Sequence, residues 1–311
     1  IRDSNNINIH VGFVAQDLKN AQFKNVEALG SLILEPLFIF YRKDLELNSL
    51  ADFKGLKVGI GPENSGTRLL AETILNLYGV NDENTLFIDQ THSIHFDMME
   101  KGELDVGFFL LPANNQFVFK LGTNPNLKIF SLKNSKAISR RFDYLYPEIV
   151  QAGGFDLRNN IPKEDIQVVS LPVDLVAKKS LDPSIVVAIS LILKEEFKEP
   201  NIISDASSFP SMKYIKNLEV NKRAKEIIEM PFGSLPFLYK YLPFKFAAFV
   251  DKFGVNLSYI LSIVIILRYI GFPTPFYYYQ KVMAHIYYKK TLKIYNKSLN
   301  SKLSEQDIKI L

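Results

Sequence analysis

Residues 54–75, KGLKVGIGPENSGTRLLAETIL, have the residue types and spacing best suited to holding a ligand. A short β-prone run is ended by a Gly-Pro pair, and apolar residues then recur at helical spacing. We expect a helix to begin near Ser65 or Thr67, with backbone N–H groups that lack an intrahelical acceptor at the positive end of the helix dipole. Asn64, Ser65 and Thr67 add short polar side chains. The pattern therefore predicts either a binding site for an anion or an ordinary helix cap.

Two nucleotide-binding motifs do not fit this stretch. No Gly-Lys-Ser/Thr closes the turn, so it is not a phosphate loop, and the three spaced glycines of the dinucleotide motif are missing. Capping alone accounts for every polar residue of the turn, so anion binding and a plain N-cap both remain open.

The composition gives little support to chemistry that needs metal ligands, thiols or a nucleophile. The chain has no cysteine, which excludes disulfides, thiolate metal sites and a cysteine nucleophile. His92 and His95 have a spacing that brings two histidines onto one helical face, but no third metal ligand has an obvious spacing. Glu103 and Asp105 are explained by the start of a strand, and no nucleophile is paired with a base. We therefore expect no enzyme activity, no metal and no cofactor.

The ligand-binding stretch belongs to a longer unit, residues 57–111, whose pattern is strand, helix, strand, helix, strand. This alternation is typical of a parallel α/β sheet. Ligands of such sheets bind at the carboxyl ends of the strands. Gln16 follows an earlier strand-like segment, and Ala113 and Asn114 follow the last strand of the unit. We expect the latter two residues to face the start of the helix.

The pattern around this unit is less regular. Residues 32–41 form an apolar run in which Pro36 predicts an irregularity or a sheet edge. Residues 133–172 are rich in loop signals, residues 167–177 return to strand character, and residues 184–198 have the spacing of an amphipathic helix.

The composition becomes aromatic and apolar after Met230. Residues 253–270 approach the roughly 20 residues that a transmembrane helix needs. Residues 235–250 contain two prolines and two lysines and suit the membrane surface better. Because lysines follow the apolar stretch and positive flanks stay in the cytoplasm, we expect one span, an internal tail and an external domain. The alternative is a buried hairpin of core helices.

Several blocks of the sequence resemble one known family. EPLFIFYRKD, SLADFKGLKVGIGPENSGTRLLAETIL and GELDVGFFLLP occur in this order, followed by GGFDLRNNIPKEDIQVVSLPVDLVAKKSLDP and FPSMKYIKNLEV. They resemble the TAXI family of solute-binding receptors of TRAP-type transporters, which have the type 2 periplasmic binding protein fold. A further block, LPFLYKYLPFKFAAFVDK, is similar to a subgroup with a membrane-associated C-terminal extension.

The resemblance implies an α/β protein of two lobes, followed by a C-terminal transmembrane helical segment. Residues 1–44 would form the remainder of the first lobe and the crossover, residues 45–165 the second lobe, and residues 166–230 the return to the first lobe with its C-terminal helices. Residues 231–311 would form the membrane-associated segment and a basic cytoplasmic tail. Family members begin with a glycine-rich strand and helix that have no counterpart here, so we expect part of the first lobe to be missing.

The resemblance also implies a ligand and a set of contacts. The ligand would be a small organic anion, a carboxylate such as an amino acid or a dicarboxylate, and Glu35 and Tyr41 would lie near the crossover between the lobes. The implied ligand contacts are Gln16 from the opposite lobe, Asn64, Ser65, Gly66 and Thr67 around the anion, and Phe109, Ala113 and Asn114 in the wall.

The partners that follow are a TRAP-type membrane permease and the lipid bilayer, with the binding domain in the cell envelope outside the cytoplasm. We expect no nucleic-acid partner, because the net charge of +4 reflects lysines that crowd the last third of the chain. The alternative function is a ligand-sensing domain that signals through its membrane segment.

Overall fold

The computed structural model describes residues 10–15, 25–271 and 275–299. It divides into two compact units, Ile1–Tyr241 and Leu242–Leu311. We call them the sheet unit and the C-terminal unit.

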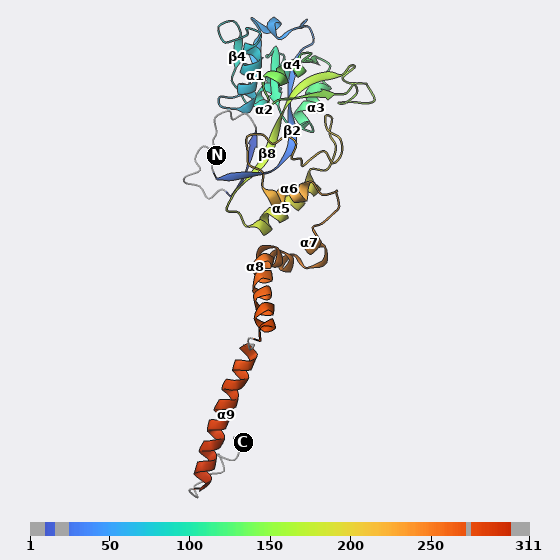
Figure 1. The fold of residues 1–311 in the computed structure, drawn as a ribbon. Helices are drawn as coiled ribbons and strands as arrows, with labels where there is room; N and C mark the ends of the chain where they lie inside the picture. Colours follow the sequence, from blue (N-terminus) through green and yellow to red (C-terminus); the bar gives the residue numbers. More distant parts are fainter. Residues whose placement is uncertain (1–9, 16–24, 272–274, 300–311) are drawn as a thin grey trace. The chain divides into compact units, whose positions relative to one another are not determined.

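The sheet unit is built on a mixed sheet of eight strands among the described residues (Figure 1). The strands are β1 (Val11–Ala15), β2 (Val26–Arg42), β3 (Lys57–Gly59), β4 (Leu86–Ile88), β5 (Val106–Leu110), β6 (Leu127–Ile129), β7 (Tyr146–Val150) and β8 (Ile166–Lys178). Their order is β1-β8-β2-β5-β3-β4, with β6 beside β2 and β7 beside β8. β3 pairs in parallel with β4 and β5, which confirms the parallel part predicted for residues 57–111.

The sheet unit also contains short helices. They are η1 (Leu50–Phe53), α1 (Gly66–Asn76), α2 (His92–Lys101), α3 (Gln116–Gly122), α4 (Ser135–Arg141), α5 (Pro183–Glu196), α6 (Lys222–Ile228) and α7 (Phe237–Tyr241). Figure 1 shows α1 to α4 around one end of the long strands β2 and β8, and α5 and α6 at the other end.

β2 changes its partner half-way along its length. It pairs with β8 as far as Pro36, and with β5 from Leu37 onward. Beyond this point the chain that contains β6 lies between β2 and β8, because Phe130 N donates to Ile39 O and Leu132 N donates to Gln167 O, each at 2.8 Å. We call the change of partner the junction.

Pro36 lies at the junction, inside a central strand and not at a sheet edge. A proline has no backbone N–H to donate, and here its carbonyl accepts from Leu111 N at 3.4 Å. The expected irregularity is thus a change of partner.

Three clusters of buried side chains hold the sheet unit together. The first lies on the face that carries α1 and includes Leu37, Leu70 and Ala71. The second lies with α2 and α3 and includes Phe38 and Phe109. The third packs β2 and β8 against α5 and α6. The sheet is therefore buried on both faces, which explains the nearly continuous apolar runs of β2 and β8.

Two elements lie in residues 133–172, where we expected mainly loops. In α4, Ile138 is buried and the hydroxyl of Ser135 donates to Gln167 Oε1 at 3.2 Å. β7 forms because it pairs with β8 from Tyr146 to Val150. Both elements depend on contacts with β8, which is distant in sequence, so local propensity alone does not reveal them.

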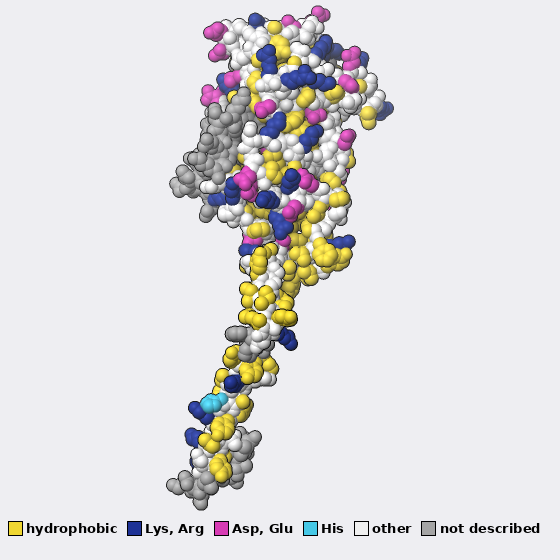
Figure 2. Space-filling model, viewed as in Figure 1, with side chains coloured by type: hydrophobic (Ala, Val, Ile, Leu, Met, Phe, Trp, Pro, Cys, Tyr) yellow, Lys and Arg dark blue, Asp and Glu magenta, His cyan; other side chains and the backbone are white. Residues whose placement is uncertain are grey.

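The C-terminal unit contains α8 (Phe244–Tyr269) and α9 (Pro275–Leu299). α8 begins at Phe244, after Pro243 at its N-cap, so it is longer than the span predicted for residues 253–270. By length and composition, α8 is the one helix of the described residues that could cross a membrane, and this is weak evidence for a span. Figure 2 shows hydrophobic side chains crowded along it.

Candidate functional site

The turn that leads into α1 has a tightly constrained backbone. Gly61 has φ +88°, and a Cβ at this position would lie 3.0 Å from both Ser65 Oγ and Thr67 Cβ. Only glycine fits there, because any side chain would be strained and would also collide with the start of the helix. Asn64 has φ 60°, a conformation that asparagine tolerates better than most residues.

The start of α1 retains two unpaired backbone donors. Ser65 is the N-cap, and its Oγ accepts a hydrogen bond from Arg68 N at 3.1 Å. Among the described residues, no acceptor bonds the backbone N–H of Gly66 or Thr67. The cap that the sequence allowed is present, and two amides remain for another acceptor at the positive end of the helix.

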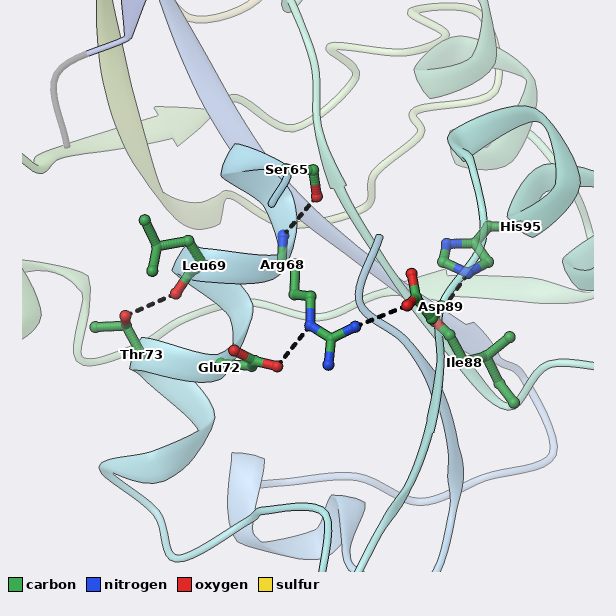
Figure 3. A network of polar contacts seen from close by, with 8 residues as sticks. All are labelled: Ser65, Arg68, Leu69, Glu72, Thr73, Ile88, Asp89 and His95. Atoms are coloured by element: carbon green, nitrogen blue, oxygen red, sulfur yellow. Dashed lines mark hydrogen bonds and ion pairs between the residues drawn. The ribbon is translucent and has the colours of Figure 1, made fainter. Parts of the chain in front are cut away.

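The charge of Arg68 is directed away from this helix start (Figure 3). Its guanidinium contacts Glu72 at 2.8 Å and Asp89 at 2.9 Å. The hydrogen bond with Glu72 raises the pKa of Arg68 above its ordinary value. Because two carboxylates already neutralise this cation, an anion at the helix start would depend on backbone amides.

The two histidines of α2 have different roles. His92 Nε2 lies 2.9 Å from Thr67 Oγ1, whereas His95 Nε2 lies 3.2 Å from Ile88 O. Burial lowers the pKa of both imidazoles, so the neutral forms are favoured. Within the described ranges no group of three or more His, Asp or Glu side chains could hold a metal ion. The HxxH pair therefore supports the helix start and the end of β4.

The end of β5 lies beside the same helix start. A Cβ on Gly66 would lie 3.4 Å from Leu110 Cδ2. Ala113 is buried and Asn114 is exposed. Phe109 has no exposed surface, and its ring centroid lies 5.8 Å from that of His92. Phe109 thus packs in the core in this conformation, and Gln16 lies outside the described residues.

Glu35 lies at the junction on the face that carries α1. Side chains two residues apart in a strand share a face, and Leu37 packs in the first cluster with Leu70 of α1. Glu35 is half-buried. Burial raises its pKa from 4.5 to about 7. Glu35 is therefore a carboxyl group in a central strand, beside the point where β2 changes partner. The sequence resemblance implied only that Glu35 would lie near the crossover between the lobes.

Sequence reasoning missed a second contact across the junction, made by residues 209–216, which we call the strap. Ser211 exchanges two backbone hydrogen bonds of 2.8 Å with Ser31 of β2. From there the ring of Tyr214 reaches Tyr146 of β7, with centroids 4.8 Å apart. Lys216 Nζ donates to Asp143 O. The strap therefore connects β2 with β7 and with the segment that precedes β7.

Two buried hydroxyls lie near the strap. Tyr146 and Ser170 are directly opposite each other in β7 and β8, so their side chains share one face of the sheet. Neither hydroxyl has a hydrogen-bond partner among the described residues. On the same strand as Tyr146, burial raises the pKa of Glu148, and the charge of Lys213 partly opposes this shift.

A family model described as the NMT1-like family matches residues 15–220, which include both long strands, the turn before α1 and the strap. The chain belongs to the NMT1-like family.

Solved structures similar to this NMT1-like protein include periplasmic binding proteins. The aliphatic sulphonate binding protein SsuA of Escherichia coli is 12% identical, with 60% of this chain and 54% of that chain covered and a TM-score of 0.40. A putative sulfonate-binding SsuA of Methylobacillus flagellatus is 13% identical, with 60% and 48% covered and a TM-score of 0.37. An ancestral arginine-binding protein bound to arginine is 16% identical, with 61% and 67% covered and a TM-score of 0.36. The chain spans about half the length of the two sulfonate-binding proteins.

Proposed function

We propose that this chain is a membrane-tethered extracytoplasmic receptor that captures a small organic anion for a TRAP-type transporter. The anion is a carboxylate, such as an amino acid or a dicarboxylate. The observation that carries the proposal is the pair of unpaired N–H groups of Gly66 and Thr67 at the start of α1. A helix start with free donors favours a negatively charged ligand.

The surroundings of these donors support the same role. The helix start lies beside the end of β5, and ligands of open α/β sheets bind at such strand ends. The arginine of the helix is already paired with two carboxylates, so it does not compete for the anion. In the proposed complex, Asn64 and Ser65 shape the turn, Gly66 and Thr67 donate from their backbone, and Ala113 and Asn114 lie at the end of the neighbouring strand.

The mechanism that we propose is closure of two lobes around the ligand. Residues 1–44 with 166–230 form one lobe, and residues 45–165 form the other. β2 and β8 connect the two ends of the sheet, so a small change in their twist at the junction alters the distance between the lobes. The TAXI-like sequence blocks support delivery to a permease, and α8 supports the tether to the bilayer.

The test uses two substitutions at Gly66, the first residue of α1. Proline is favoured at this helix position, and Ser65 already has the extended backbone, φ −81° and ψ 152°, that a following proline requires. Gly66→Pro removes the N–H. Gly66→Ala retains the N–H and provides the matched control for added side-chain atoms.

We expect calorimetric titration of the full chain with glutamate and succinate to give a Kd for Gly66→Pro roughly 10- to 100-fold weaker than for Gly66→Ala, because a hydrogen bond to a charged group contributes about 1.5 to 3 kcal/mol. Equal affinities in two variants of equal thermal stability would reject the helix start as the anion site. Absence of binding to either compound by the unmodified chain would reject the carboxylate class.

A further inference from the structure

α9 has a one-sided distribution of charge. The helix contains five lysines and one histidine, and its sequence PFYYYQKVMAHIYYKKTLKIYNKSL has no acidic residue. The cationic and titratable side chains are Lys281, His285, Lys289, Lys290, Lys293 and Lys297. An α-helix turns about 100° per residue, so all six fall within one half of its circumference.

The opposite half of α9 carries no charged residue and is rich in aromatic side chains. It contains Phe276, Tyr277, Met283, Tyr287, Tyr288, Ile294 and Tyr295. Tyr287 is 60% exposed and Tyr288 is 62% exposed. Tyrosine and phenylalanine are the side chains that prefer the boundary between lipid and water. Figure 2 shows basic and hydrophobic side chains together along this helix.

The lysines of α9 also repel one another. Lys289 and Lys293 are four residues apart on the helix, and like charges at this spacing destabilise an isolated helix in water. Within α9 no acidic side chain compensates for this repulsion. A surface of negative charge would reverse the effect, because it attracts each lysine and screens their mutual repulsion.

We infer that α9 binds the anionic headgroups of phospholipids and lies along the bilayer surface, with its lysines at the phosphates and its aromatic half at the lipid–water boundary. The inference rests on the proposed function only in that α8 holds the chain at a bilayer. It differs from the role of α8, since α9 is less apolar than a membrane-spanning helix needs to be. An electrostatic contribution of this kind requires anionic lipid, whereas insertion of an apolar helix does not.

The absence of cysteine makes a site-specific test possible. The full chain with Tyr287→Cys is labelled with an environment-sensitive fluorophore and reconstituted into phosphatidylcholine vesicles, with or without phosphatidylglycerol. Both membranes carry a spin-labelled lipid that quenches near the headgroups. Co-flotation of the protein with each kind of vesicle separately measures membrane attachment through α8.

We expect quenching with phosphatidylglycerol and at least about tenfold less association of α9 with phosphatidylcholine alone, because several lysines act together. Replacing all five lysines by glutamine should abolish the difference, and replacing them by arginine should preserve it. Co-flotation should be the same for all variants.

Equal quenching in both membranes, or in the glutamine variant, would overturn the inference in favour of purely apolar contact. No quenching in either membrane would also overturn it, and a response of the label to single-stranded RNA alone would identify a nucleic-acid tail. If co-flotation is lost but quenching on phosphatidylglycerol is retained, α8 is not a membrane tether and that part of the proposed function fails. The inference about α9 is then unaffected.

Discussion

Two apolar helices of this protein, α5 and α8, have opposite surroundings. α5 buries Val186, Val187 and Leu193, and two of these, Val186 and Leu193, belong to the third cluster of the sheet unit. α8 is also rich in isoleucine, leucine and valine, yet Ala247 is its one buried residue. Val187 is 1% exposed, whereas Val264 in the C-terminal half of α8 is 54% exposed.

The difference shows that apolar composition alone does not reveal whether a helix is surrounded by a protein core or by lipid. The apolar face of α5 is one-sided and meets β2 and α6, whereas α8 is apolar around most of its circumference. A helix that is hydrophobic on all sides needs a protein core or a bilayer around it. Since α8 exposes these side chains, lipid is the environment that we propose for it.

The largest expected effect is that of a lysine placed in the buried face of α5. Val187→Lys puts an unpaired charge into the buried face of α5, and we expect it to destabilise the sheet unit by more than about 4 kcal/mol. Denaturant unfolding measures the change. The matched control is Ile192→Lys on the same helix, where the side chain is 59% exposed, and its effect should stay within about 0.5 kcal/mol. Similar effects of the two substitutions would mean that α5 does not pack as described.

A valine-to-lysine substitution in α8 should leave the sheet unit stable but weaken the insertion of α8 into the membrane. We expect Val264→Lys to oppose insertion by up to about 2.5 to 3.5 kcal/mol, which is the effect of a lysine at the centre of a membrane helix. Flotation with phosphatidylcholine vesicles measures the membrane-bound fraction, and Val264→Leu is the control that keeps the site apolar. If Val264→Lys unfolds the sheet unit instead, α8 is a core helix and the comparison with α5 fails.

A smaller effect should come from Glu35, the half-buried acid of the sheet unit. Its folded pKa of about 7 lies above the ordinary 4.5, so the stability associated with its protonated form is present below pH 4.5 and is lost as the pH rises through about 7. Glu35→Gln should remove this loss, which is about 2 kcal/mol after allowance for the solvent access of the group.

The free energy of unfolding is measured for wild type and variant at pH 4.5 and at pH 8. The effect of Glu35 is the amount by which the difference between the two proteins changes with pH. The half-buried His92 and the buried His95 act in the opposite sense, since their pKa values are lowered and they favour the folded state less as the pH falls below 6.5. Both histidines are present in wild type and in the Glu35→Gln variant, so their contributions cancel in the comparison. The exposed Glu100→Gln provides the control, and an equal pH dependence for Glu35→Gln and wild type would contradict the burial of Glu35.

The sequence alone determined the features that depend on local patterns. The strand, turn and helix at residues 57–76 have a glycine at the strained position, a serine at the cap and apolar residues at helical spacing, so the local signals agree. The alternation of strands and helices likewise predicted the parallel pairing of β3 with β4 and β5. The long apolar run of residues 253–270 predicted the greater part of α8.

Only the tertiary structure decided how these pieces meet. The partner change of β2 at Pro36 and the pairing of β7 with β8 join segments far apart in the chain, and no local pattern records which strands become neighbours. The same reason explains why Phe109 lies in the core and why Thr67 contacts His92. It also explains the strap, since Tyr214 contacts Tyr146, a residue distant from it in the sequence. Local backbone preference sets an element, but burial against distant segments sets its neighbours.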